Sequence, residues 1–341
     1  MKAAVFEKTG SLTVCDVPLR PLNDDEMLIR VDACGICGTD VHIVAGESRS
    51  TPPVVLGHEF AGTVVDAGRH ADIFAPGTNV AIDPNIPCGT CVYCRRGYVH
   101  LCERLRALGV DINGGMSEYC IIPYRQAYAL PPGLSIEHAA MIEPISCVVH
   151  GIDKAHIEAG ESVVILGGGT IGMIMMQLAR ASGASTIILS EPNSEKRNNA
   201  ASFGADYTVD PSSADLASVV QDLTQIGADC VIECAGRRET AEQALALSRK
   251  GGRVVLFGVC PIGETIAMEP NRIYSHELTI AGSYVNPFTF SRAADLIASG
   301  RIRMDAFRID TFSLDDVHEA LAAQREGRTM KSMILPHRHN R

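Results

Sequence analysis

Four cysteines lie within the fifteen residues from Cys88 to Cys102, with the spacing C-x2-C-x2-C-x7-C. Such a group could form a disulfide staple, an iron–sulfur cluster, a redox pair or a metal site. A ferredoxin-type cluster has a different spacing and a proline after its last cysteine, which Cys102 lacks. A thioredoxin-like pair would use two cysteines rather than four. The set Cys88, Cys91, Cys94 and Cys102 therefore predicts a closed tetrahedral zinc site with a structural role.

A second set of metal-binding side chains lies outside this loop. Cys37 in "CGICGTDVH", with His58 and Glu59 in "GHEFAG", supplies one thiolate, one imidazole and one carboxylate. Three protein ligands that leave a fourth position open are typical of a catalytic zinc site. The fragment "MIEP" offers one more carboxylate, Glu143. Each residue alone would indicate little, so the prediction depends on their joint occurrence.

The segment "LGGGTIG" has the pattern G-x-G-x-x-G, and it joins an expected strand to an expected helix. In this pattern Gly167 allows a tight turn, Gly169 lets the backbone approach a pyrophosphate, and Gly172 lets helix and strand pack closely. The helix that begins at Thr170 and Ile171 presents its N–H groups and its positive dipole end to phosphate. The segment therefore predicts a dinucleotide site.

Glu191 ends the next expected strand, 19 residues after Gly172. This is close to the spacing of a carboxylate that accepts hydrogen bonds from the adenosine ribose. A 2′-phosphate would meet that carboxylate at close range, so we expect NAD rather than NADP. Lys196 and Arg197 follow shortly after, and Arg197 is a further candidate for cofactor binding, which would hold a 2′-phosphate if Glu191 turned outward.

The elements expected around these residues form two domains, as a chain of 341 residues favours. Residues 1–150 contain short apolar segments bounded by turn residues, which predicts an antiparallel β-barrel domain that includes the cysteine lobe 88–102. Residues 151–286 alternate short strands with helices, which predicts an α/β domain with a doubly wound parallel sheet. Residues 287–341 should return to the first domain. Strands are expected at 162–166 and 185–189, and helices at 171–183, 194–204, 239–249, 290–300 and 314–327.

Composition excludes several classes of function. The chain has 30 basic and 40 acidic residues, a formal net charge of −10, and no basic stripe that would indicate nucleic-acid binding. No apolar stretch reaches the ~20 residues that a membrane helix needs. The start "MKAAVFEKTG" lacks the apolar segment of a secretory signal. We therefore expect a cytoplasmic protein with neither a nucleic-acid nor a membrane partner.

Taken together, these motifs resemble the zinc-dependent medium-chain dehydrogenase/reductase superfamily, and its polyol dehydrogenase branch most of all. The resemblance covers essentially the whole chain and rests on "CGTDVH", "GHEFAGTVVDAG", the cysteine lobe, "EP", "GGGTIG" and the closing helices. It implies a GroES-like β-barrel catalytic domain and a Rossmann domain. It also implies two zinc ions per chain, one held by the four cysteines and a catalytic one held by Cys37, His58, Glu59 and Glu143.

The resemblance also implies roles for residues near the catalytic metal. Asp40 matches an acid that orients the zinc-binding histidine, Thr39 the hydroxyl that contacts the alcohol, and His42 the outer base of a proton relay. Glu59 is counted as a catalytic residue as well as a ligand. The implied reaction is reversible hydride transfer between a secondary alcohol of a polyol or diol and NAD. The family implies a homo-oligomer, either a tetramer or a dimer.

Other functions stay open at this point. A threonine or vicinal-diol dehydrogenase of the same superfamily would have the same motifs. A non-enzymatic zinc- and nucleotide-binding protein need not keep Thr39 and His42, and a zinc-free quinone reductase need not keep the metal residues. Sorbitol-oxidising members carry an arginine after the nucleotide domain, whereas this chain reads "AGSYVNPFTF" there, which disfavours sorbitol itself.

Overall fold

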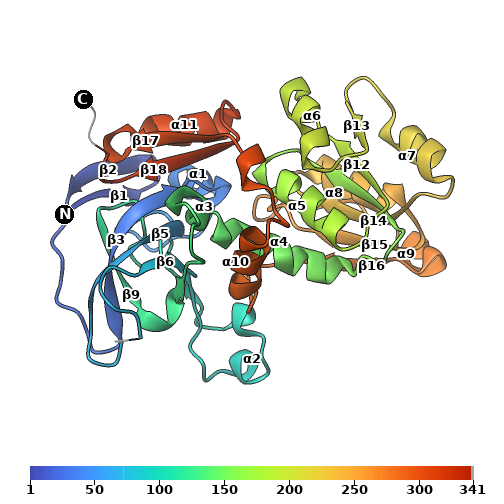
Figure 1. The fold of residues 1–341 in the computed structure, drawn as a ribbon. Coiled ribbons are helices and arrows are strands. Elements are labelled where there is room, and N and C mark those ends of the chain that lie inside the picture. Colours follow the sequence, from blue (N-terminus) through green and yellow to red (C-terminus); the bar gives the residue numbers. More distant parts are fainter. Residues whose placement is uncertain (72, 339–341) are drawn as a thin grey trace. The chain divides into compact units, whose positions relative to one another are not determined.

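The computed structural model describes residues 1–71 and 73–338, which form two compact units (Figure 1). The first unit comprises Met1–Ser146, Pro287–Ala298 and Phe307–Arg341, and the second comprises Cys147–Asn286 and Ser299–Ala306. The predicted ranges, 1–150 with 287–341 and 151–286, therefore differ from these units at residues 147–150 and 299–306. One reason is that helix α4 (Ile142–Ala155) runs across the first boundary. The last residues of the predicted tail, 339–341, lie outside the described residues.

The first unit is built mainly from β-strands. Its strands are β1 (Lys2–Lys8), β2 (Ser11–Asp16), β3 (Glu26–Gly35), β4 (Val54–Val55), β5 (Glu59–Ala67), β6 (Asn79–Ile82), β7 (Asn85–Ile86), β8 (Arg106–Ala107), β9 (Tyr119–Pro123), β10 (Ala127–Ala129), β17 (Ile309–Ser313) and β18 (Lys331–Leu335). One sheet has the order β10-β6-β5-β3-β18-β17 with β9 also paired to β3, and a smaller sheet has the order β2-β1-β4. Among the described strands of this unit, only β17 and β18 pair in parallel.

Short helices complete the first unit. They are α1 (Gly38–Ala45), α2 (Val92–Arg95), α3 (Ile136–Ala140), α10 (Phe290–Ala298) and α11 (Val317–Glu326), with 3₁₀ turns η1 (Val99–Leu101), η2 (Tyr124–Gln126) and η5 (Leu314–Asp316). The alternating residues Met27, Ile29 and Val31 of β3 are fully buried, as a strand with one face on the core requires. Val317 and Ala320 of α11 belong to the same core. The tail is therefore part of this core, and it places β18 directly beside β3.

The second unit is an α/β fold. Its strands are β11 (Ser162–Leu166), β12 (Thr186–Ser190), β13 (Tyr207–Val209), β14 (Ala228–Glu233), β15 (Ser248–Leu256) and β16 (Thr279–Gly282). Its further helices are α5 (Thr170–Ala181), α6 (Ser194–Ala200), α7 (Leu216–Thr224), α8 (Arg238–Leu247) and α9 (Pro270–His276), with 3₁₀ turns η3 (Ala201–Phe203) and η4 (Met304–Ala306).

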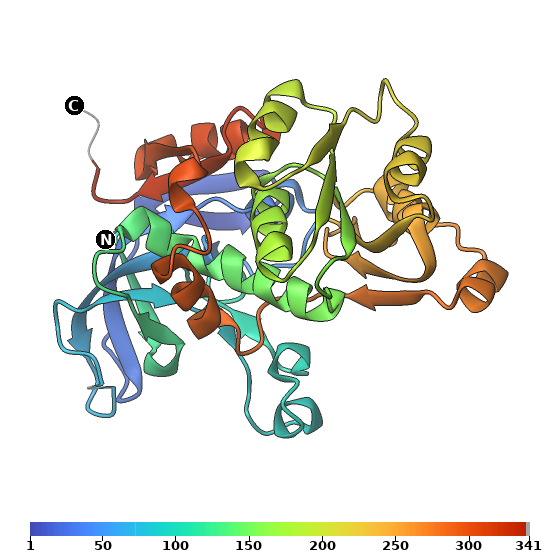
Figure 2. The same ribbon diagram turned by 45° about the vertical axis from the view of Figure 1, so that its right-hand side comes forward.

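The sheet of the second unit is parallel throughout, in the order β13-β12-β11-β14-β15-β16. Figure 2 shows the helices flanking it. All five residues of β11 are buried, as expected for a strand covered on both faces. The strand order reverses between β11 and β14, which is where ligands bind in doubly wound sheets. The predicted α/β class with a doubly wound parallel sheet is confirmed. In the described ranges, the helices are all too short or too polar to cross a bilayer.

Candidate metal centres and nucleotide site

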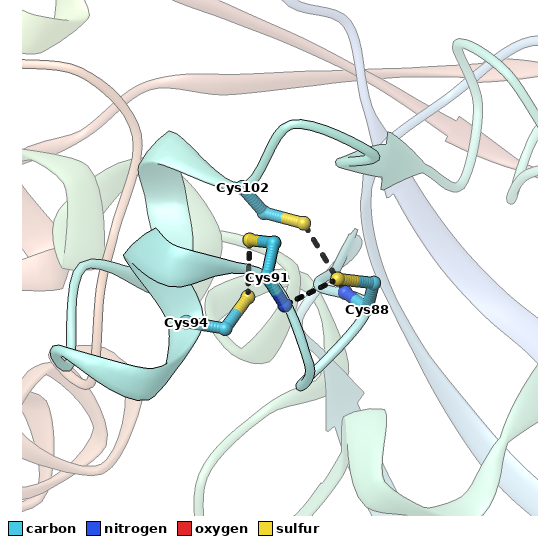
Figure 3. A group of neighbouring side chains, drawn as sticks. All are labelled: Cys88, Cys91, Cys94 and Cys102. Atoms are coloured by element: carbon cyan, nitrogen blue, oxygen red, sulfur yellow. Dashed lines mark hydrogen bonds between the residues drawn. The ribbon is translucent and has the colours of Figure 1, made fainter.

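The four cysteines of the lobe converge on one point (Figure 3). Their sulfur atoms lie within 4.8 Å of one another. A tetrahedral site with zinc–sulfur distances of about 2.3 Å would place the sulfur atoms about 3.8 Å apart. All four are free cysteines rather than half-cystines. The donor set and its spacing therefore fit a zinc ion after small shifts of the side chains.

Backbone N–H groups of the lobe donate hydrogen bonds to these sulfur atoms. The N–H group of Cys88 donates to Cys102 Sγ at 3.2 Å, and that of Cys91 donates to Cys88 Sγ at 3.4 Å. Hydrogen bonds from Thr90 and Cys91 lower the pKa of the Cys88 thiol to about 5. Burial, with Cys91 and Cys102 as neighbours, raises the pKa of the Cys94 thiol to about 12. Hydrogen bonds from backbone N–H groups also lower the pKa of the Cys91 thiol, so the loop favours thiolates at Cys88 and Cys91, and a bound cation would favour ionisation of Cys94 as well.

The second metal-binding set is assembled by the pairing of β3 with β5. The register places Gly35 opposite Glu59, so Cys37, two residues beyond Gly35, lies beside His58. The ligand atoms of Cys37, His58 and Glu59 lie within 4.8 Å of one another. His58 is 8% exposed and Glu59 is 2% exposed. One thiolate, one imidazole and one carboxylate at this spacing fit a zinc ion with an open position.

The carboxylate of Asp40, on α1, lies beside two of these ligand residues, Cys37 and His58. This carboxylate is fully buried; Oδ2 accepts from the Cys37 N–H group at 2.9 Å, and Oδ1 lies 3.4 Å from Nδ1 of His58. Asp40 thus faces one ring nitrogen of His58 and leaves Nε2 for a metal ion. Burial lowers the pKa of His58, but Asp40 and Cys37 raise it more, so its pKa lies well above the ordinary value. The surroundings of His58 therefore favour a positive charge.

Sequence reasoning missed Lys331, the first residue of β18. Its ammonium group forms an ion pair with Glu59 Oε2 and donates to the carbonyl of Ile36 at 3.0 Å. Lys331 is only 3% exposed. Gly35 provides the necessary room, because a Cβ there would lie 2.9 Å from Cε of Lys331. The sequence did hold a signal, since Lys331 is the charged residue of the otherwise apolar or small segment "KSMIL".

The other residues predicted for this site are Thr39, His42 and Glu143. Thr39 and His42 lie one turn apart on α1 and so share a face. Cys37 Sγ donates to Thr39 Oγ1 at 3.6 Å, whereas the partly exposed His42 has Nδ1 2.7 Å from Oε2 of Glu47. Glu143 is buried in the first turn of α4, but its carboxylate is not in the ligand group formed by the described residues.

The glycine-rich loop has the geometry that its pattern predicts. Gly167 has φ +106°, a left-handed conformation that favours glycine. A Cβ at Gly172 would overlap the carbonyl oxygen of Gly167, so only glycine lets α5 approach β11 this closely. At Gly169, by contrast, no atom lies within 4 Å of the Cβ position. That space, at the N-terminus of α5 where Thr170 and Ile171 begin the helix, is open to a phosphate.

Glu191 follows β12 directly and points toward this loop. Its Oε2 accepts from the N–H group of Gly168 at 2.7 Å, and its Oε1 accepts from that of Asn193 at 2.8 Å. Arg197 donates to the carbonyl of Glu191 at 2.6 Å and forms an ion pair with Asp210 at 2.9 Å. Glu191 therefore lies where an adenosine ribose is expected, and the charge of Arg197 is already compensated.

Two sequence models cover most of the chain. The alcohol dehydrogenase GroES-like domain matches residues 23–132, and the zinc-binding dehydrogenase domain matches residues 170–299. The chain belongs to the zinc-dependent medium-chain dehydrogenase/reductase superfamily. The predicted GroES-like and Rossmann domains are confirmed, as is the class of activity: this dehydrogenase is an oxidoreductase that acts on CH–OH groups. Zinc and a nicotinamide nucleotide are its cofactors.

Similar proteins extend over nearly the full length of this dehydrogenase. It is 32% identical to D-arabinitol dehydrogenase 1 of Uromyces fabae, over 98% of this chain and 97% of that protein. It is 35% identical to L-threonine 3-dehydrogenase of Pyrococcus horikoshii, over 98% of each. A crystal structure described as a zinc-binding dehydrogenase from Sinorhizobium meliloti 1021, bound to NADP, is 44% identical with a TM-score of 0.95, over 98% of this chain and 99% of that one.

Proposed function

We propose that this dehydrogenase oxidises a secondary alcohol of a sugar alcohol or vicinal diol, reversibly, with NAD as the acceptor. The observation that carries this proposal is the ligand set of Cys37, His58 and Glu59, whose atoms lie within 4.8 Å of one another. A carboxylate in place of a second thiolate makes the set harder, which suits chelation by neighbouring hydroxyl groups. The similarity to an arabinitol dehydrogenase supports the same class of substrate.

We assign the residues around this ligand set separate roles in removing the proton of the substrate hydroxyl. When bound, zinc supplies a Lewis acid for the substrate oxygen. Thr39, whose hydroxyl lies 3.6 Å from the sulfur of Cys37, takes a hydrogen bond from the substrate hydroxyl. His42 lies one turn further along α1 and is partly exposed, so it can pass the proton to solvent. The buried carboxylate of Asp40, 3.4 Å from Nδ1 of His58, favours the ring orientation that leaves Nε2 for the metal.

Two contacts support NAD over NADP. Glu191 has its carboxylate turned inward, 2.7 Å from the N–H group of Gly168, where a 2′-phosphate would meet a negative charge. Arg197 is paired with Asp210 at 2.9 Å and so has no uncompensated charge to offer a 2′-phosphate. Because the Sinorhizobium meliloti relative is bound to NADP, the test must include both cofactors.

We further propose two zinc ions per chain with separate roles. The four-cysteine lobe is a closed site that stabilises the fold, and the Cys37 site is the catalytic one. Glu143 is proposed as an additional ligand only if its carboxylate moves into the Cys37 group on metal binding. A homotetramer or homodimer, as the family implies, stays a prediction that sedimentation velocity tests.

The deciding experiment follows reduction of NAD⁺ and NADP⁺ at 340 nm with a panel of pentitols, hexitols, vicinal diols and L-threonine. We expect the highest kcat/KM for a polyol or diol with NAD⁺. Cys37→Ser serves as the inactive control. L-Threonine is the second candidate, favoured by the threonine dehydrogenase relatives, and a kcat/KM at least tenfold higher for L-threonine than for every polyol and diol would replace the proposal.

A further inference from the structure

A cavity of about 490 Å³ lies in the second unit, where α7, α8 and α9 meet the start of β15. This volume is within the range of small-molecule sites. The cavity lies at the amino end of β15, whereas the glycine-rich loop follows the carboxyl end of β11. Because the strands are parallel, these positions are on opposite edges of the sheet. The cavity is therefore not part of the nucleotide site.

One wall of this cavity is basic. Arg249, Lys250, Arg272 and His276 all line it, and the described lining includes no acidic residue, although the chain has a net charge of −10. Arg249 is compensated by Asp229, whose Oδ1 lies 2.5 Å from its Nε. Lys250 and Arg272 form no ion pair with any described residue. Two uncompensated cations and a histidine therefore surround the same space.

Arg272 and His276 also have polar nitrogen atoms that the folded chain leaves without a partner among the described residues. Arg272 is anchored by one hydrogen bond, from Nη2 to the carbonyl of Ala246 at 3.0 Å. Its Nε and the Nδ1 of His276 are both buried, and neither has a hydrogen-bond partner within the described part of the chain. A polar group that has lost water without gaining a partner is destabilising. A small rotation of either side chain toward an anion in the cavity would supply the missing partner.

Another wall of the cavity is apolar. Val220 and Leu247 are buried there, while Ile226 is 68% exposed at the rim. A second hollow of about 210 Å³ shares Ala217, Ala246 and Leu247 with the cavity and continues along α7 and α8. An occupant with an anionic group at one end and an apolar body at the other would contact both walls.

We propose that this cavity binds a phosphate monoester with an apolar or aromatic organic part. A phosphate monoester carries close to two negative charges at neutral pH and has three acceptor oxygens. It therefore matches Lys250 and Arg272 in charge and gives His276 an acceptor, whereas a carboxylate would compensate only one cation. The apolar part lies against Val220, Ile226 and Leu247. This site is independent of the reaction proposed above.

The test is calorimetric titration of the zinc-loaded protein with phenyl phosphate in a phosphate-free buffer. Saturating NAD⁺ fills the nucleotide site, so its phosphate-binding loop cannot account for the signal. We expect saturable binding that weakens at least tenfold in Arg272→Gln and in Lys250→Gln. Arg325→Gln, which alters an exposed arginine of α11 in the first unit, should bind phenyl phosphate as the unchanged protein does. Benzoate should bind at least tenfold more weakly, and benzyl alcohol should not bind.

Several results would overturn the proposal. Absence of saturable binding, or equal binding by the unchanged protein and both pocket variants, would show that phenyl phosphate does not use this cavity. Equal affinity for benzoate would refute the phosphate assignment. Arg272 also contacts the end of α8 through the carbonyl of Ala246, so the thermal unfolding of Arg272→Gln is measured as well. If Arg272→Gln proves to be unfolded, the binding measured with Lys250→Gln decides the test. If Ile226→Ser changes the sedimentation coefficient and phenyl phosphate does not bind, the face is an interface between copies of the chain.

Discussion

Replacing Lys331 by methionine should strengthen zinc binding at the Cys37 site while it weakens the metal-free fold. Lys331 is 3% exposed and Glu59 is 2% exposed, so the substitution leaves a buried carboxylate without its cation. Removal of one partner from a buried ion pair costs about 3–5 kcal/mol. A zinc ion bound by Glu59 would compensate the same carboxylate, so most of this cost should disappear in the zinc-loaded protein.

The difference between the two states sets the expected change in affinity. Each 1.4 kcal/mol corresponds to a factor of ten, so a difference of about 3 kcal/mol corresponds to zinc binding about 100-fold tighter. Burial lowers the pKa of Lys331, but the charge of Glu59 raises it more, so its pKa lies above the ordinary lysine value. The ammonium group is therefore charged at neutral pH, and on the alkaline side its contribution is lost as the pH rises through the raised pKa.

The assay combines chelator competition with thermal unfolding of the zinc-free and zinc-loaded proteins. A Cys37→Ser background isolates the structural site, so the change can be assigned to the catalytic one. Lys2→Met is the matched control, because Lys2 pairs with Asp315 at the surface, where a salt bridge contributes about 0–1 kcal/mol. Equal destabilisation of both states, or weaker zinc binding in Lys331→Met, would show that Lys331 supports the metal site rather than competing with the metal.

Three further predictions test the site residues. Cys37→Ser should abolish turnover but keep about one zinc per chain, whereas Cys94→Ser should first lower thermal stability, because structural zinc binding is coupled to folding; one zinc or none in fully active enzyme would contradict this pair. Thr39→Val should lower kcat by ~10²-fold or more with a smaller effect on KM, measured with the best polyol; an unchanged kcat would remove Thr39 from the relay. Glu191→Ser should shift the ratio of kcat/KM toward NADP, and no shift would mean that Glu191 does not select the cofactor.

Much of the second unit was predictable from the sequence because many of its elements follow from local pattern, although β13, α7 and α9 were not among the expected elements. The strand expected at 162–166 is β11 without change, and the helix expected at 171–183 is α5, Thr170–Ala181. A run of buried apolar residues followed by a glycine-rich turn defines both elements before any tertiary contact forms. The donor chemistry of the cysteines and of the Cys37 set was also visible, because it depends on residue type and spacing.

What the sequence did not predict depends on tertiary structure. Helix α1 contains Val41, Ile43 and Val44, whose branched side chains favour strands. It forms because Asp40 accepts from the N–H group of Cys37 and because Gly46 ends it with φ +79°. Helix α4, Ile142–Ala155, was likewise not expected, so the position of Glu143 could not be derived. The ion pair of Lys331 with Glu59 joins residues 272 positions apart, a separation that no local pattern reports.

The place of β18 in its sheet has a consequence for the order in which the protein matures. β18 lies between β3 and β17, and it is the last strand of the described chain. During synthesis Cys37, His58 and Glu59 leave the ribosome long before Lys331 does, but a domain folds as a unit. Because β18 belongs to the sheet and the core of the first unit, that unit can be completed only after Lys331 has emerged. The metal ligands and the cation that competes with zinc for Glu59 should therefore come together in the same late step, so zinc should enter the catalytic site after this step rather than during synthesis.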